Sequence, residues 1–159
     1  MSILKLSPLF KQKSLKPARR PVAPKSIPPQ NAEDLEKMAM EAMADLSQKF
    51  PAWASGDVQK MKTIVSEAGG VFGEKRAEII RQQLYPKAHD LKGQGATFGY
   101  PLITDIGSHM CRLMSGKKTF SSGDLSVLRS DIMLMETVLW KKLKGDGGKK
   151  GSEILEKLK

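Results

Sequence analysis

Residues 85–99 read YPKAHDLKGQGATFG, and this stretch is the most informative part of the 159-residue chain. Apolar residues recur through it, and through the residues just before it, at steps of three and four, the spacing of one face of an α-helix. His89 falls nearly on the opposite side, so its ring should face water while the helix packs behind it. The pattern predicts a helix of about 73–97 whose core side carries Ala77, Ile80, Leu84, Ala88, Leu91, Gly95 and Phe98.

The side of this helix that bears His89 has a distinctive composition. At about 100° per residue, four other positions lie within roughly 60° of the histidine. These positions are Tyr85, Lys92, Gly93 and Ala96. Glycine in a helix interior costs roughly 1 kcal/mol relative to alanine. We therefore interpret Gly93 as a place where the backbone of another protein approaches closely.

Pro86 is the local anomaly of the predicted helix. A proline in a helix interior loses the amide bond to the residue four positions earlier, here Gln82, and its ring clashes with that carbonyl. We expect Pro86 to kink the helix one turn before His89, or to break the helix there.

The rest of the chain also follows helical spacing, divided by cap and breaker residues. Asn31 is expected to start the first helix and Pro51 to end it. Pro101 suits the first turn of a later helix, and Ser121 starts the last one. We find no alternating strand pattern and no internal repeat. The expected helices span about 32–50, 57–68, 73–97, 101–114 and 121–140.

Helices joined by short turns indicate an all-α protein, an antiparallel bundle in residues 31–144. Residues 1–30 hold six prolines among scattered lysines. That composition cannot propagate a helix or bury a core, so it predicts a disordered arm. Residues 145–159 begin with four glycines in seven residues, which predicts a flexible linker followed by a short C-terminal tail. The last eight residues of this tail are compatible with a short basic helix.

The formal net charge of +10 is concentrated at the two ends of the chain. Residues 1–30 carry seven basic residues and no acid, and residues 141–159 carry seven lysines against three acids. Residues 31–140 hold thirteen basic and fourteen acidic residues, so the predicted domain is nearly neutral. The basic charge of the two ends allows two interpretations. The ends are either solvated tethers, or they attract an acidic partner, a membrane surface or nucleic acid.

The single cysteine, Cys111, cannot form an internal disulfide and fits a small buried thiol in a reducing, cytoplasmic setting. No apolar run approaches the ~20 residues needed to span a bilayer. The first residues also lack the pattern of a secretory signal. We therefore expect a cytoplasmic protein.

A solvent-facing histidine can act as a nucleophile near pH 7, because a pKa of about 6.5 leaves the ring mostly neutral. His89 could therefore accept a phosphoryl group. The added negative charge would need a nearby cation, and Lys92 lies one helical turn away. Gly93 leaves no side chain beside the ring.

The run His89-Asp90-Leu91-Lys92-Gly93, followed by Phe98 and Gly99, resembles the signature of histidine-containing phosphotransfer (HPt) domains. These domains are small helical carriers in the phosphorelays of two-component signal transduction. The resemblance in motif covers some fifteen residues, and the helical layout extends it to about 32–144. It implies a four-helix bundle with an additional N-terminal helix.

By that resemblance His89 is the phosphoaccepting residue, Lys92 stabilises the phosphoryl group, and Gly93 admits the partner. Tyr85, Gln94 and Ala96 belong to the same partner-binding surface. The implied partners are receiver domains of response regulators and of hybrid histidine kinases, and the magnesium ion would belong to the receiver. The chain would act as a monomeric phosphocarrier with no cofactor of its own. It shows no P-loop motif, so we expect no autonomous kinase activity.

Other interpretations use different residues. An adaptor could bind nucleic acid or an anionic membrane through the basic ends, although these ends lack interleaved aromatic residues for base stacking. A degenerate carrier could bind receivers without transferring phosphate. We interpret His109 as a packing or rim residue, because it has no lysine-glycine companion. His89, His109 and Cys111 match no zinc-binding spacing, so no metal site is expected.

Overall fold

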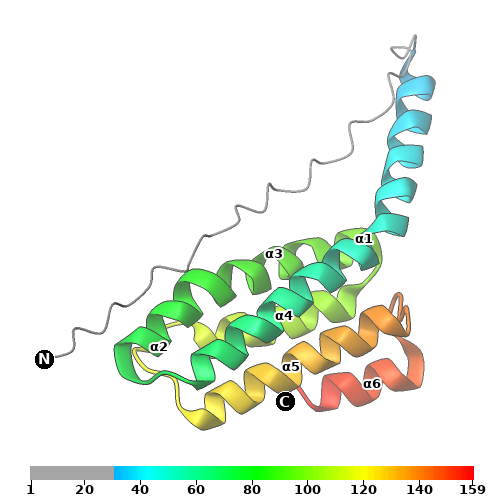
Figure 1. Cartoon of the computed structure of the whole chain (residues 1–159). Coiled ribbons are helices and arrows are strands. Elements are labelled where there is room, and N and C mark those ends of the chain that lie inside the picture. Colours follow the sequence, from blue (N-terminus) through cyan, green and yellow to red (C-terminus); the bar gives the residue numbers. More distant parts are fainter. Residues whose placement is uncertain (1–30) are drawn as a thin grey trace, which may run out of the picture.

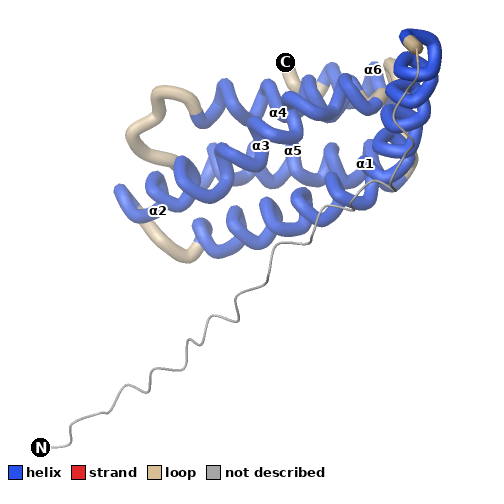
Figure 2. Tube along the Cα trace, turned by 90° about the horizontal axis from the view of Figure 1, so that it is seen from above, coloured by secondary structure: helices blue, strands red, loops and turns tan. Residues whose placement is uncertain are grey.

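The computed structural model describes residues 31–159, and every regular element in this range is helical (Figures 1 and 2). This confirms the predicted all-α class. The predicted arm, residues 1–30, lies outside the described residues. The elements are α1 (Ala32–Gly69), α2 (Gly73–Ile79), η1 (Ile80–Leu84), α3 (Tyr85–Gly95), η2 (Ala96–Phe98), α4 (Pro101–Met114), α5 (Ser122–Trp140) and α6 (Gly148–Glu156).

Helix α1 is one continuous helix, so the predicted end at Pro51 and the separate second helix are wrong. Its start is as expected, since the Asn31 side chain accepts a hydrogen bond from the backbone N–H of Asp34 at 2.8 Å. Buried residues begin at Phe50 and continue beyond the proline. This burial keeps the helix continuous across Pro51. A proline that packing holds inside a helix bends the helix instead of ending it. Figure 1 shows α1 changing direction where it joins the body.

The core lies between the second half of α1 and the helices from α2 to α5. Helix α3 packs on α4, α4 packs on α5, and α5 packs on α1. Figure 2 shows these helices running alongside one another. The largest fully buried side chains come from α1, η1, α3, α4 and α5 and from Tyr100 just before α4, and they include Phe50, Met61, Ile80, Leu84, Leu91, Ile106, Met110, Leu128 and Ile132.

The long predicted helix of residues 73–97 is present, and Pro86 neither ends it nor separates it into two bodies. A π-helical turn, η1, lies immediately before α3. There the Tyr85 N–H donates to the carbonyl of Ile80, five residues earlier, rather than to the residue four positions back. Pro86 therefore falls in the first turn of α3, where a missing N–H costs little.

Buried Arg76 anchors α2 to two other segments. Its Nε donates to the carbonyl of Ala68 at 3.1 Å, and a terminal guanidinium nitrogen donates to the carbonyl of Phe120 at 2.9 Å. The guanidinium also lies over the ring of Phe72. These bonds satisfy a buried cation and fix α2 against the end of α1 and the α4–α5 connection.

Helix α6 begins inside the stretch that was expected to be a flexible linker and overlaps the first part of the expected short C-terminal helix. It packs on α4 and buries Ile154 to 1% exposure. The glycines serve the packing: a Cβ on Gly151 would lie 1.7 Å from the carbonyl oxygen of Asp146. Gly147 has a φ of +66°, which favours glycine.

Within residues 31–159, no helix has a stretch long and apolar enough to cross a membrane.

Candidate functional site

His89 lies on the exposed side of α3. Ala88 and Leu91 are buried on the other side, so the helical phase predicted from the sequence is confirmed. Lys92 and Gly93 are exposed with the histidine, one turn further along. The helix therefore presents the imidazole, the ammonium and an exposed stretch of backbone on one surface.

Tyr85 forms the N-terminal side of this surface. Its ring stacks on the His89 ring, with centroids 6.1 Å apart and planes inclined by 24°. Tyr85 is half-buried: its side chain packs partly against the core and also lies beside the histidine. A stacked aromatic ring restricts the imidazole to fewer orientations.

Gly93 faces open space. A Cβ added to it would meet no atom within 4 Å, so the protein's own packing does not require a glycine there. Gln94 and Ala96 are also exposed. The six residues predicted as site residues thus share α3 and the short η2 that follows it.

The fold itself requires glycine at positions 95 and 99. A Cβ on Gly95 would lie 2.8 Å from the backbone nitrogen of Thr104 and from the carbonyl oxygen of Tyr100, so α4 approaches α3 closely here. Gly99 ends the helix with a φ of +86°, a conformation in the left-handed region. Beside it, Phe98 packs against Phe50, with ring centroids 5.1 Å apart.

Two residues of α4 that the sequence analysis did not single out support the backbone beneath Lys92. The Thr104 hydroxyl donates to the carbonyl of Lys92 at 2.9 Å and accepts the backbone N–H of Ala96 at 2.8 Å. Gly107 brings α4 against α3, since a Cβ there would lie 2.9 Å from Lys92 Cβ and 3.1 Å from the carbonyl oxygen of Ala88. The one signal in the sequence was a glycine inside an apolar helical pattern, where glycine is unfavourable.

An open hollow of about 590 Å³ adjoins the His89 surface. Tyr85 and Lys92 of α3 form one wall, and Leu155 and Leu158 at the C-terminal end of the chain form another. Helix α4 contributes Asp105, Ser108, Cys111 and Arg112, and Ser115 follows directly after it. Burial raises the pKa of the Cys111 thiol, and the charge of Lys92 acts in the opposite direction. This hollow could not be predicted from the sequence, because one of its walls depends on the packing of α6 on α4.

His109 is not among the residues that line this hollow, and it pairs with a buried carboxylate on α5. Its Nδ1 is 2.8 Å from Oδ2 of Asp131, and the histidine is half-buried, in agreement with its interpretation as a packing residue. Burial raises the pKa of Asp131, while the hydrogen bond from His109 acts to lower it. Among residues 31–159, no group of three or more His, Cys, Asp or Glu side chains is placed to hold a metal ion.

Chemically, the His89 surface offers a nucleophilic imidazole, a mobile ammonium one turn away and an unobstructed backbone beside them. It lies on a helix with a packed far side, so it can meet a partner without rearranging the core. No protein-family model matches the chain, and comparisons with curated proteins and with solved structures also give no match.

Proposed function

We propose that this protein is a histidine phosphocarrier that shuttles a phosphoryl group between receiver-domain aspartates in a phosphorelay. The observation that carries the proposal is the common exposed surface of His89, Lys92 and Gly93. Each residue there has a chemical use in phosphoryl transfer. Gly93 in particular is not required by internal packing, which supports a role in the approach of a partner.

In the proposed step, a neutral ring nitrogen of His89 attacks the phosphorus of an aspartyl phosphate on the receiver. A nitrogen–phosphorus bond forms as the phosphorus–oxygen bond to the aspartate breaks, and the aspartate leaves as a carboxylate. The other ring nitrogen keeps its proton, so charge is conserved. The same step in reverse delivers the group to a downstream receiver.

The division of labour follows from what each partner supplies. The receiver's acidic pocket and magnesium ion would provide most of the electrostatic stabilisation for an in-line transfer. On this chain, Lys92 would neutralise the phosphoryl charge, and Tyr85 would limit the orientations of the His89 ring. Gln94 and Ala96 would lie at the edge of the contact. The chain would not phosphorylate itself from ATP.

We further propose that the helices form an antiparallel four-helix bundle with an additional N-terminal helical segment. The bundle would consist of the second half of α1, the continuous helical stretch from α2 to α3, α4 and α5. The first half of α1 would be the additional segment. The short connections between successive helices and the packing of α3 on α4, α4 on α5 and α5 on α1 support this arrangement. A monomer acting in the cytoplasm would fit this role.

The decisive experiment incubates the protein with a panel of receivers labelled on their aspartates. Label should move to the protein in an acid-labile form, and His89→Gln should abolish it. His109→Gln serves as the matched control and should keep the label, with circular dichroism showing that both variants remain helical. The proposal is wrong if no receiver transfers label, or if the label survives in His89→Gln.

A second variant tests the proposed role of Lys92. Lys92→Ala should slow transfer but leave an acid-labile label on His89, because it removes a stabilising charge and not the nucleophile. Equal transfer rates in Lys92→Ala and wild type would remove Lys92 from the mechanism.

A further inference from the structure

The first half of α1 projects from the body, as Figure 1 shows, and no residue from 32 to 49 is buried. We call residues 32–49 the projecting segment. Its apolar residues nonetheless follow helical spacing and continue the line of the buried Phe50. This apolar stripe consists of Leu35, Met38, Ala39, Ala42, Met43 and Leu46, and Leu35 is 58% exposed.

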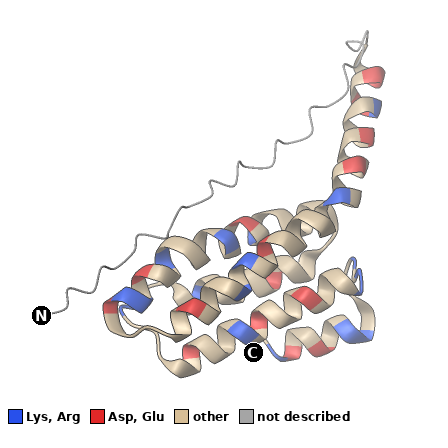
Figure 3. Cartoon of the chain, in the orientation of Figure 1, with Lys and Arg blue, Asp and Glu red and all other residues tan. Residues whose placement is uncertain are grey.

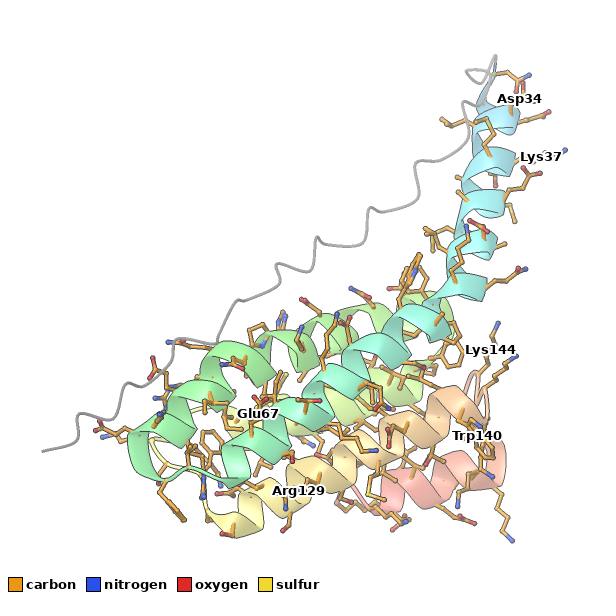
Figure 4. The ribbon with its side chains drawn as sticks, viewed as in Figure 1. Asp34, Lys37, Glu67, Arg129, Trp140 and Lys144 are labelled. Carbon is orange, nitrogen blue, oxygen red and sulfur yellow. The ribbon has the colours of Figure 1, made fainter. Side chains whose placement is uncertain are left out.

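The projecting segment is acidic. It holds five acidic residues and two lysines, so its formal charge is −3 (2 minus 5). On the helical wheel Asp34, Glu41 and Asp45 border one edge of the apolar stripe, and Glu36 borders the other. Figure 3 shows these charges along the projecting segment, and Figure 4 shows Asp34 and Lys37 standing out from its helix. An occupant of the stripe should therefore combine apolar side chains with positive charge.

The chain contains a segment with that chemistry. Residues 1–30 carry seven basic residues and no acid, and their apolar residues are concentrated in residues 3–10. The set comprises Ile3, Leu4, Leu6, Leu9 and Phe10, with Lys5, Lys11 and Lys13 among and after them.

The covalent connection makes the meeting of the two segments feasible. Residues 11–30 can span up to about 66 Å when extended, and the helix from 32 to 50 is only about 27 Å long. Residues 3–10 can therefore reach any point of the apolar stripe. Attachment to the first residue of α1 also gives them a high effective concentration there.

We propose that residues 3–13 dock on the apolar stripe of the projecting segment, with the leucines and Phe10 covering the stripe and the lysines facing its acidic edges. A second copy of the chain is the less favourable occupant, because it would bring one −3 segment against another. The docked segment would leave the His89 surface free, since α3 contributes nothing to the stripe.

A nitroxide on Ser7→Cys, in a Cys111→Ser background of the full chain, tests the contact by nuclear magnetic resonance. Amide signals of the stripe should lose most of their intensity, while those of α5 keep theirs. Raising the salt concentration should restore part of the lost intensity, because screening weakens the charged edges. Unchanged stripe signals would overturn the proposal.

Matched variants separate docking from simple proximity. Replacing Leu6, Leu9 and Phe10 by serine should abolish the effect, whereas replacing Leu15, Val22 and Ile27 by serine should not. On α1, Leu46→Asp should abolish it, whereas Met40→Asp should not, because Met40 is 67% exposed and lies outside the stripe. Equal results within either pair would contradict the proposal.

Two further measurements cover the remaining outcomes. A mixture of isotope-labelled protein without nitroxide and unlabelled protein with it should show no loss of stripe signals. Loss in this mixture would identify a second copy as the occupant and overturn the proposal. If the Cys111→Ser background does not fold, amide shifts of wild type and of the Leu6, Leu9, Phe10 triple variant can be compared without any cysteine change. The stripe should then show the largest differences, and no difference there would refute docking.

Discussion

Gly107 of α4 lies directly against Lys92 of α3, so closely that a methyl group on the glycine would lie 2.9 Å from the Cβ of the lysine. Lys92 is the cation of the candidate site. Its backbone can lie this close to α4 only because Gly107 has no side chain. The Thr104 hydroxyl supports the same turn through the Lys92 carbonyl. Two α4 residues thus position a residue of the exposed surface.

Gly107→Ala should destabilise the protein by about 1–3 kcal/mol, because backbone atoms of α3 would have to move to admit the methyl group. The free energy of unfolding in urea measures this effect. Gly56→Ala is the matched control, since a Cβ there meets no atom within 4 Å and should stabilise α1 slightly. Equal changes in the two variants would show that the helices do not approach as closely as described.

Two substitutions of Gly93 separate its effect on stability from its effect on phosphoryl transfer. The substitution should raise the free energy of unfolding by about 0.5–1 kcal/mol, because alanine is the better helix former and the space is open. Gly93→Leu should slow phosphoryl transfer from a receiver by blocking its approach. Gly56→Ala should raise stability in the same way and leave transfer unchanged. Normal transfer in Gly93→Leu would remove this glycine from the partner contact.

Asp131 should make the stability of the protein depend on pH. Burial raises the pKa of its carboxyl above the ordinary value of 3.8. A raised folded-state pKa means that its contribution is fully present below about pH 3.8 and is lost as the pH rises through the raised value. Asp131→Asn removes this ionisation. In urea unfolding at a series of pH values, the variant should therefore gain stability relative to wild type as the pH rises. A difference that stays constant with pH would contradict this expectation.

Ile154 and Leu155 test whether α6 is held to the body. Ile154→Ala should cost about 2 kcal/mol or more, because a buried side chain is lost from the contact with α4. Leu155→Ala should cost much less, since Leu155 is 39% exposed. Hydrogen exchange of the α6 amides is the measurement, and exchange should become faster in Ile154→Ala alone. Similar exchange in the two variants would mean that α6 is not anchored through Ile154.

The helical class and the orientation of His89 could be predicted because both depend on local spacing. The buried positions Ala88 and Leu91 fix the phase of α3 within a few residues of the histidine. The predicted start of the last helix at Ser121 is likewise local, and Ser121 forms a capping box with Asp124 there. Such features need no knowledge of what packs against the helix.

The errors arose where distant contacts decide the structure. Pro51 is a strong helix breaker in isolation, but Phe50 and Ala54 on either side of it are buried by other helices. Gly151 was interpreted as part of a linker, although it is needed where the chain folds back on Asp146. Thr104 could not be assigned a role because its partner, Lys92, lies twelve residues away on another helix.

The π-helical turn before α3 has a consequence for the direction in which His89 faces. A π turn contains about one residue more than an α turn, and each residue of an α-helix turns the chain by about 100°. Deleting one residue from Ile80–Leu84 would therefore return this turn to α-helical geometry and leave His89 on nearly the same side relative to the Arg76 anchor, whereas deleting one from a regular α-helical turn would rotate His89 by about 100°. The direction of the imidazole therefore depends on a turn of which only Ile80 and Leu84 are buried, and this turn accommodates one extra residue without moving His89 to another side of the helix.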